Sequence, residues 1–240
     1  MKKIKRLWEV DTTRGIAIIM MIISNFILDL AVFAGQNINI TSGFWLYFAR
    51  LTAFLFIFIA GLSLTLSYSR TGKNFRKYFL RGIRIFGWGL LITLLTWFVF
   101  PQNTIWFGIL HLIGLSIIIS YPFLKMKKLN LIIGLLIVFL GFYLDKIIID
   151  SPWLIWLGLK HQGFSSFDYV PLLPWFGVFL IGIFLGNILY PEGKSKLKFS
   201  DFSDKLIIRF LTKFGRNSLF IYLIHQPILI GLLILFLQFT

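Results

Sequence analysis

A chain of 240 residues that is 58% hydrophobic and only 14% charged carries more apolar side chain than a soluble domain can bury, which excludes a large soluble protein. A net charge of +15 would suggest nucleic-acid binding in a soluble chain, but here the basic residues fall between apolar segments, as membrane topology requires. The absence of cysteine excludes disulfides, thiolate nucleophiles and cysteine-ligated metals.

Seven apolar segments of roughly 16–25 residues are long enough to cross about 30 Å of hydrocarbon at about 1.5 Å per residue. We therefore expect an all-α integral membrane protein, a bundle of about seven transmembrane helices that forms one multi-pass domain over residues 1–240. In chain order the predicted spans cover residues 13–34, 44–68, 80–100, 105–124, 129–145, 170–190 and 218–239.

The connections between these segments alternate in charge. Basic residues gather at the N-terminus and in the second, fourth and sixth connections, and of the 24 basic residues only Arg50, Lys146 and Lys160 fall elsewhere. The positive-inside rule then predicts a cytoplasmic N-terminus and a C-terminus on the outer side. No cleavable signal peptide is expected, because the basic start leads into a span that is too long for one.

Two further segments are not expected to cross the membrane. Residues 151–167 form a predicted outer loop, whose Trp153 and Trp156 suit the membrane interface. Residues 199–214 read FSDFSDKLIIRFLTKF and place Phe, Leu and Ile against Lys and Arg. This pattern predicts an amphipathic helix at the inner membrane surface.

Polar residues form a stripe along the first span. On a helical wheel Asp11, Arg14, Asn25 and Asp29 fall within roughly 60° of one another. Such a stripe is expected to face protein or a water-filled cavity, because a charge in contact with lipid is costly. At the cytoplasmic end alone, a structural alternative is that Asp11 caps the helix and Arg14 pairs with Glu9 or a lipid phosphate.

Three ionisable residues in different spans lie at one predicted depth. Asp29, Arg50 and His111 are each about 7–11 Å below the outer edge of the membrane at 1.5 Å per residue. An acid, a base and an imidazole at one depth suggest a reaction site. The alternative is an Asp29–Arg50 ion pair that locks two helices together, with His111 hydrogen-bonded nearby.

The other two histidines are less informative. His225 lies in the last predicted span, two residues before Pro227. Proline leaves a backbone carbonyl one turn earlier without its helical hydrogen bond, and this either lines a cavity or only accompanies a kink in the helix. His161 lies in the outer loop and is expected to be a solvated surface residue.

A dense basic patch opens the third span. Its charges either set the membrane topology and contact anionic lipid, or bind a soluble polyanion such as the phosphates of a nucleotide carrier. No phosphate-binding loop, dinucleotide fingerprint or metal-ligand spacing accompanies it. The patch consists of Arg76, Lys77, Arg81 and Arg84.

Five sequence blocks follow one another in a recognisable order. The first reads Glu9-x-Asp11-x-x-Arg14-Gly15-x-Ala17, followed by Asn25 and Asp29. The others read FGILHLIG (107–114), DYVPLLPWFG (168–177), LIGIFLG (180–186) and GRNSLFIYLIHQP (215–227). Together they resemble the heparan-alpha-glucosaminide N-acetyltransferase catalytic-domain family of the transmembrane acyltransferase superfamily, over nearly the whole chain. The chain looks most like the short prokaryotic branch.

The resemblance implies a membrane acyltransferase that takes acetyl from acetyl-CoA, usually on the cytoplasmic side. The acetyl group passes to an amino or hydroxyl group of a sugar that faces the other side. Acetyl-CoA is then a donor substrate, and no metal is expected. The implied partners are membrane lipids and a glycan or glycolipid acceptor, with no nucleic acid and with a homodimer left open. The implied location is the cell membrane.

The resemblance also assigns the cofactor side of the reaction. Arg14, Arg81 and Arg84 would hold the CoA phosphates, and His225 is placed with them as a cofactor-binding residue. The thioester would then reach toward Asn25 and the three residues predicted at one depth.

The same resemblance assigns the chemistry. His111 would be the general base for the acceptor, and Asp29 would orient or charge-balance the imidazole. Arg50, Asn25 or a backbone N–H would stabilise the oxyanion. Alternatively His111 is itself acylated. Animal members of the family carry their catalytic histidine in the loop after the first span. The corresponding loop here, AGQNINITSG, has none, and Asn25 stands where many short relatives carry a histidine, so His111 takes the role partly by elimination.

Two other functions are compatible with the sequence. A proton-coupled transporter or flippase would use the same acid, base and imidazole for proton or substrate binding, and the prolines Pro171, Pro174 and Pro227 permit the broken helices it needs. A non-catalytic lipid-binding or scaffold protein is the third. Saturable binding of acetyl-CoA separates the acyltransferase from both.

Overall fold

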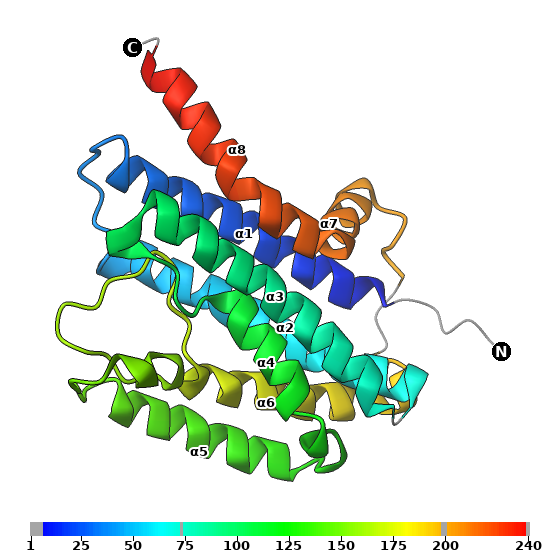
Figure 1. Ribbon diagram of the computed structural model, residues 1–240. Helices are drawn as coiled ribbons and strands as arrows, with labels where there is room; N and C mark the ends of the chain where they lie inside the picture. The colour runs from blue at the N-terminus through cyan, green and yellow to red at the C-terminus, as the bar shows by residue number, and fades with distance from the viewer. Residues whose placement is uncertain (1–6, 73, 198–200, 239–240) are drawn as a thin grey trace. The chain divides into compact units, whose positions relative to one another are not determined.

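The computed structural model describes residues 7–72, 74–197 and 201–238 (Figure 1). Short 3-10 turns connect several of the helices. The α-helices of the described residues are α1 (Trp8–Val32), α2 (Gly43–Thr71), α3 (Phe75–Val99), α4 (Ile109–Ile119), α5 (Leu129–Leu144), α6 (Leu172–Leu189), α7 (Leu206–Arg216) and α8 (Ser218–Gln238).

The helical class expected from the sequence is confirmed, and a helix lies in each of the seven predicted spans. Five helices of the described residues, α1, α2, α3, α6 and α8, are long and apolar enough to cross a membrane. The other two are shorter, with 11 residues in α4 and 16 in α5. The predicted span 105–124 is shortened because α4 starts only after Gly108 and ends before a 3-10 turn that begins at Pro122.

The predicted amphipathic helix exists but begins later than expected. Helix α7 starts at Leu206, and residues 199 and 200 of the predicted segment lie outside the described residues, as do Lys2, Lys3, Lys5, Arg6, Lys73, Lys198 and Phe239. The apolar residues Leu206 and Ile207 are 81% and 72% exposed. Exposed apolar side chains on a basic helix are typical of a helix that lies in a membrane interface.

The predicted outer loop contains a short 3-10 helix over Pro152–Leu157. Trp153 is 83% exposed and so does not belong to the core, in agreement with an interfacial role. The hydroxyl of Tyr169 donates a hydrogen bond to the carbonyl oxygen of Ile155 at 2.8 Å. Burial, together with the negative charge of Asp145, raises the pKa of Tyr169. The hydroxyl therefore stays protonated and keeps its hydrogen bond to the loop.

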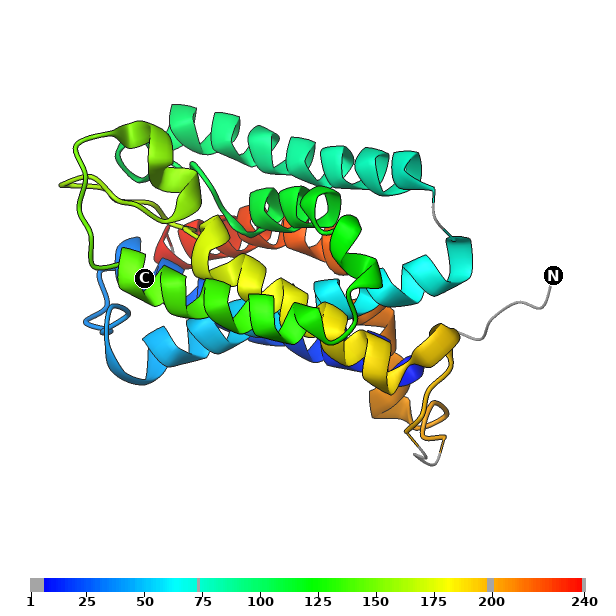
Figure 2. The same cartoon turned by 90° about the horizontal axis from the view of Figure 1, so that it is seen from below.

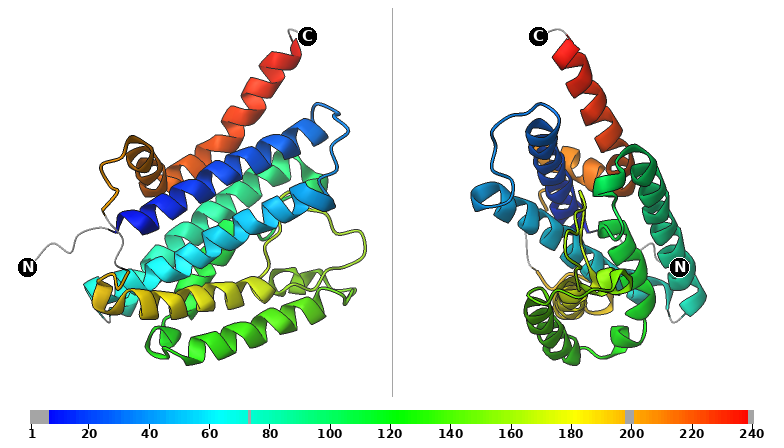
Figure 3. Two further views of the ribbon diagram at one scale, coloured as in Figure 1. Left: turned by 180° about the vertical axis from the view of Figure 1, so that it is seen from behind. Right: turned by 60° about the vertical axis from the view of Figure 1, so that its left-hand side comes forward.

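The chain divides into two compact units. Unit 1 comprises Met1–Phe56 together with Lys198–Thr240, and unit 2 comprises Ile57–Leu197. In unit 1, α7 lies beside the first half of α1, and α8 also packs against α1 (Figures 1 and 3). The beginning and the end of the sequence therefore build one unit together.

Two glycines bring α1 and α7 into backbone contact. A Cβ atom on Gly15 would overlap the carbonyl oxygen of Leu211, and one on Gly215 would overlap the carbonyl oxygen of Asp11. Backbone atoms cannot rotate away as side chains do, so only glycine fits at either position. Small residues at such crossings are a usual device of membrane helices, because close backbone approach maximises van der Waals contact.

Unit 2 is built from three helix pairs with similar contacts. The antiparallel helices α5 and α6 lie side by side (Figure 2), and Gly134 and Gly177 meet where they cross. The later part of α2 packs on α6 through Gly61 and Gly182. Helices α3 and α4 also pack together, and this pair positions one of the predicted site residues.

Candidate functional site

The acid of the first span, Asp29, lies in the interior of unit 1. Its side chain is 0% exposed, and its Oδ1 accepts a hydrogen bond from Nε2 of Gln226 in α8 at 2.6 Å. The other carboxylate oxygen, Oδ2, and the amide oxygen of Gln226 are both buried without a hydrogen-bond partner in the described part of the chain. The expectation that this face of α1 meets protein is confirmed at Asp29.

His225 precedes Gln226 in α8 and is 9% exposed. Its Nδ1 lies 2.6 Å from the carbonyl oxygen of Tyr222, one turn earlier in the same helix. A carbonyl oxygen only accepts, so Nδ1 carries a hydrogen and donates it. In the neutral ring Nε2 then holds the lone pair, and no hydrogen bond to Nε2 is found among the described residues.

Asn25 and Arg50 were expected near Asp29 and His111, but Asn25 is only half-buried and Arg50 is exposed. Asn25 donates from Nδ2 to the carbonyl oxygen of Met21 at 3.0 Å, within its own helix. Among the ion pairs of the described residues there is none between Asp29 and Arg50: the arginine is exposed, and the buried carboxylate contacts Gln226.

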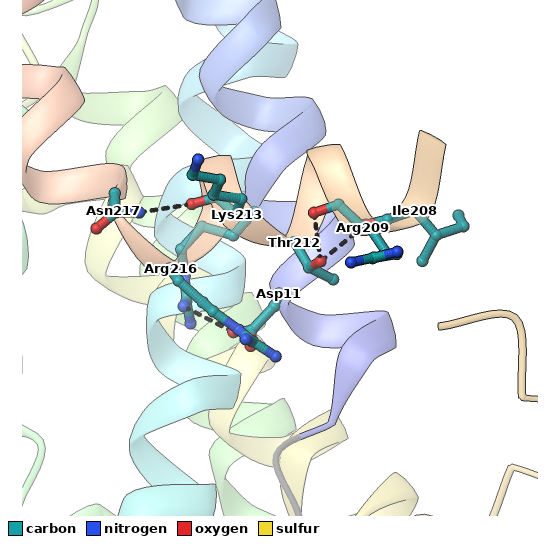
Figure 4. Close-up of polar contacts among 8 residues, drawn as sticks. Asp11, Ile208, Arg209, Thr212, Lys213, Arg216 and Asn217 are labelled. Atoms are coloured by element: carbon teal, nitrogen blue, oxygen red, sulfur yellow. Dashed lines mark hydrogen bonds and ion pairs between the residues drawn. The ribbon is translucent and has the colours of Figure 1, made fainter. Parts of the chain in front are cut away.

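Asp11 joins α1 to α7 (Figure 4). Its Oδ1 lies 3.3 Å from Nη1 of Arg14 on the same helix, and its Oδ2 lies 3.2 Å from Nε of Arg216 at the end of α7. Asp11 is not the helix cap that the structural alternative proposed, because α1 begins earlier and its N-cap residue is Leu7. Arg14, expected to bind CoA phosphates, is thus engaged by a carboxylate within unit 1.

His111 lies in unit 2, in the first turn of α4, and is 2% exposed. Its Nδ1 accepts the backbone N–H of Gly108 at 3.2 Å, and its Nε2 lies 3.2 Å from Oγ1 of Thr93. The Thr93 hydroxyl donates its hydrogen to the carbonyl oxygen of Ile105 at 2.6 Å, so Nε2 must be the donor to Thr93. His111 is therefore a neutral ring with both nitrogens occupied.

The surroundings of His111 are closely fitted. A Cβ atom on Gly89 of α3 would lie 2.9 Å from the imidazole, so only glycine leaves room for the ring. Phe107 stacks on the ring with centroids 5.5 Å apart, and Phe86 meets it edge-on at 5.2 Å. The carboxylate of Asp168 accepts the backbone N–H of Ile109 at 3.1 Å and so caps the same end of α4.

A basic pocket lies in unit 2 at the end of α2 and the beginning of α3. Its volume is about 350 Å³. Arg81 and Arg84, two of the predicted cofactor-binding residues, line it together with Lys77, whereas Arg76 does not. The remaining lining residues are Ser67, Tyr78 and Leu80. Three cations and two hydroxyl groups around one hollow suit an anionic ligand.

A second pocket of unit 2, of about 470 Å³, carries mixed charge. Lys125 and Lys127 line it, but so does Glu192, whose carboxylate would repel a phosphate. The first pocket is therefore the better fit for a polyphosphate. Among the described residues no group of three or more histidine, aspartate and glutamate side chains is arranged to hold a metal ion.

Comparison with protein families decides the identity. The model described as heparan-alpha-glucosaminide N-acetyltransferase, catalytic, matches residues 6–227. The chain belongs to this family. The resemblance inferred from the five sequence blocks is thereby confirmed, and the protein is a member of a family of membrane N-acetyltransferases. Comparisons with curated proteins and with solved structures gave no match.

The acetyltransferase family match extends over every predicted site residue. The sequence did not point to three residues that surround these predicted sites, Gln226, Thr93 and Asp168. Gln226 stands inside a quoted block, GRNSLFIYLIHQP, but nothing in the sequence joins it to Asp29. Thr93 carried no signal of its own. Asp168 opens the block DYVPLLPWFG, but nothing in the sequence connects it to Ile109, which lies 59 residues earlier.

Proposed function

We propose that the protein transfers an acetyl group from acetyl-CoA to an amino or hydroxyl group of a sugar-containing acceptor, as a multi-pass protein of the cell membrane. The observation that carries the proposal is the family match over residues 6–227. The buried polar residues of α1 and α8 support it, because polar groups inside apolar helices are retained mainly for function.

His225 is the proposed general base. Its Nδ1–H bond to the Tyr222 carbonyl fixes the tautomer in which Nε2 accepts a proton, and the same bond stabilises the imidazolium that forms. His111, first expected in this role, has both nitrogens occupied within unit 2. A positioning role suits His111 better, since it links Gly108 at the start of α4 to Thr93 of α3.

The proposed step balances without a metal. The acceptor nitrogen or oxygen attacks the thioester carbonyl while its proton moves to Nε2 of His225, and the collapsing intermediate releases CoA as a thiolate that takes this proton back. Asn25 keeps one amide hydrogen beyond its bond to Met21 and is the proposed donor to the oxyanion, together with Arg50. Arg14 is proposed to contact CoA phosphate while it keeps its bond to Asp11, since a guanidinium group carries five N–H donors.

The basic pocket is the proposed site for CoA phosphates. Replacing both Arg81 and Arg84 with glutamine is expected to raise the KM for acetyl-CoA at least about tenfold, since a hydrogen bond to a charged group contributes about 1.5–3 kcal/mol. The kcat should change less than about twofold, because the phosphates are remote from the thioester. Steady-state kinetics over a range of acetyl-CoA concentrations measures both constants.

The matched control for this pocket is Arg76→Gln. Arg76 is exposed on the same helix but does not line the pocket, so its removal should leave the KM unchanged. Equal KM values in the control, the double variant and the parent would assign the arginines to topology and anionic lipid instead.

The function itself is tested by release of free CoA. The protein purified in detergent is incubated with acetyl-CoA and a panel of amino sugars, and acceptor-dependent CoA release is the expected result. Absence of both turnover and saturable acetyl-CoA binding would overturn the proposal and favour the proton-coupled transporter or flippase.

A further inference from the structure

Two buried oxygen atoms in the interior of unit 1 have no hydrogen-bond donor among the described residues. They are Asp29 Oδ2 and Gln226 Oε1, whereas Asp29 Oδ1 and Gln226 Nε2 are joined at 2.6 Å. Each of these oxygens belongs to a planar group whose other polar atom is already hydrogen-bonded. Both oxygens are acceptors, so they cannot hydrogen-bond to each other. A buried polar atom without a partner destabilises the fold by about 1–3 kcal/mol.

No positive charge compensates the Asp29 carboxylate among the described residues of unit 1. Within the described part of unit 1, α7 and α8 pack on α1. Helix α8 contains no lysine or arginine, and its titratable groups near Gln226 are Tyr222 and His225, whose Nδ1–H is directed to the Tyr222 carbonyl. On α2, Arg50 is exposed and forms no ion pair with Asp29.

The cations of α1 and α7 lie at the other end of α1. Arg14 is fifteen residues from Asp29, which corresponds to about 22 Å along the helix, and it pairs with Asp11. Arg216 also pairs with Asp11, and Arg209 and Lys213 belong to the same short helix α7. An ionised carboxylate that is 0% exposed in an apolar helix, without any of these cations, would be strongly unfavourable.

We propose that Asp29 binds a proton on Oδ2 and forms a cyclic acid–amide pair with Gln226. Oδ2–H then donates to Gln226 Oε1, while Gln226 Nε2–H donates to Asp29 Oδ1. A single proton, taken from water, satisfies both orphaned oxygens and removes the buried charge. The resting Asp29 is thus a neutral acid that orients its neighbours through hydrogen bonds and does not balance a positive imidazole.

Infrared spectroscopy of the purified full-length protein tests the proposal. A protonated carboxyl group has a carbonyl stretching band that a carboxylate lacks. At pH 7 the parent should show this band, Asp29→Asn should lose it, and the matched control Asp145→Asn should keep it, because Asp145 is an exposed carboxylate paired with Lys160. In Gln226→Leu the band should move to higher frequency, since the carbonyl loses its hydrogen bonds. A folded parent without the band at pH 7 would overturn the proposal.

Thermal unfolding provides a second readout. The side-chain amide that Asp29→Asn introduces can donate to Gln226 Oε1 as the acid does, so this variant should unfold within about 2 °C of the parent. Asp29→Leu should unfold several degrees lower, because it leaves the Gln226 amide unpaired. If sodium ions raise the unfolding temperature of the parent but not of Asp29→Asn, a bound cation and not a proton occupies the pair, and the proposal is wrong. Neither infrared spectroscopy nor thermal unfolding depends on acetyl transfer, so this proposal can fail while the proposed function holds, and the reverse.

Discussion

Replacing His225 with glutamine is expected to reduce the rate of acetyl transfer by about 100-fold or more, the usual contribution of a positioned general base. Glutamine keeps much of the volume and polarity of the imidazole but cannot accept a proton at neutral pH. Because His225 is 9% exposed and bonded within its own helix at Tyr222, the change should alter chemistry more than packing. The kcat from CoA release, with thermal unfolding as a check of the fold, measures the effect.

His161→Gln is the control for this experiment, since His161 lies in the connection between α5 and α6 and has no proposed part in the reaction. It should retain the activity of the parent. A different result would reverse the assignment. If acetyl transfer survives His225→Gln but is lost in His111→Gln at unchanged thermal stability, the base is His111, and one of its two hydrogen bonds must open during catalysis.

Replacing Gly215 with alanine should destabilise unit 1 by about 3 kcal/mol, the upper part of the usual range for overpacking. The new Cβ would overlap the carbonyl oxygen of Asp11 and lie 3.0 Å from the backbone nitrogen of Gly15. Both neighbours are backbone atoms of α1, so α7 must shift away from it. That shift would also strain the bond between Arg216 and Asp11. Thermal unfolding in detergent measures the loss of stability.

Gly231→Ala is the matched control. Gly231 also lies within a helix, α8, but a Cβ atom there would have no neighbour within 4 Å. Alanine is favoured over glycine inside helices by up to about 1 kcal/mol, so this variant should be neutral or slightly more stable. Equal stability of Gly215→Ala and Gly231→Ala would contradict the close contact between α1 and α7.

The helices were predictable because their signal is local. Apolar runs of sufficient length identified α1, α2, α3, α6 and α8, and the polar face of α1 followed from a spacing of residues that needs no partner. The limits of α4 were not predictable in the same way. Its first turn depends on Asp168, which lies 59 residues away and caps Ile109, and on His111, which folds back to Gly108.

The candidate site was predictable only in part, because a sequence shows depth but not direction. The polar stripe of the first span was expected to face protein or a water-filled cavity, and Asp29 is buried against protein. Equal depth also suggested an ion pair between Asp29 and Arg50, but the arginine is exposed and the acid meets Gln226. Which ring nitrogens of a histidine are hydrogen-bonded depends on neighbours such as Thr93, which are distant in the sequence. His111 and His225 could therefore be distinguished only in the folded structure.

Unit 1 is built from two segments that are far apart in the sequence, so it cannot assemble until both have been synthesised. Asp29 and Gln226 are separated by 197 residues, and Asp11 and Arg216 by 205. At about 5–20 residues per second, the ribosome needs about 10–40 s to proceed from the acid to the amide. Through that interval α1 lacks the partners of its polar face. Release of α7 and α8 is thus the event that lets unit 1 assemble, and a nascent chain that stops before α7 leaves Asp29 without its amide.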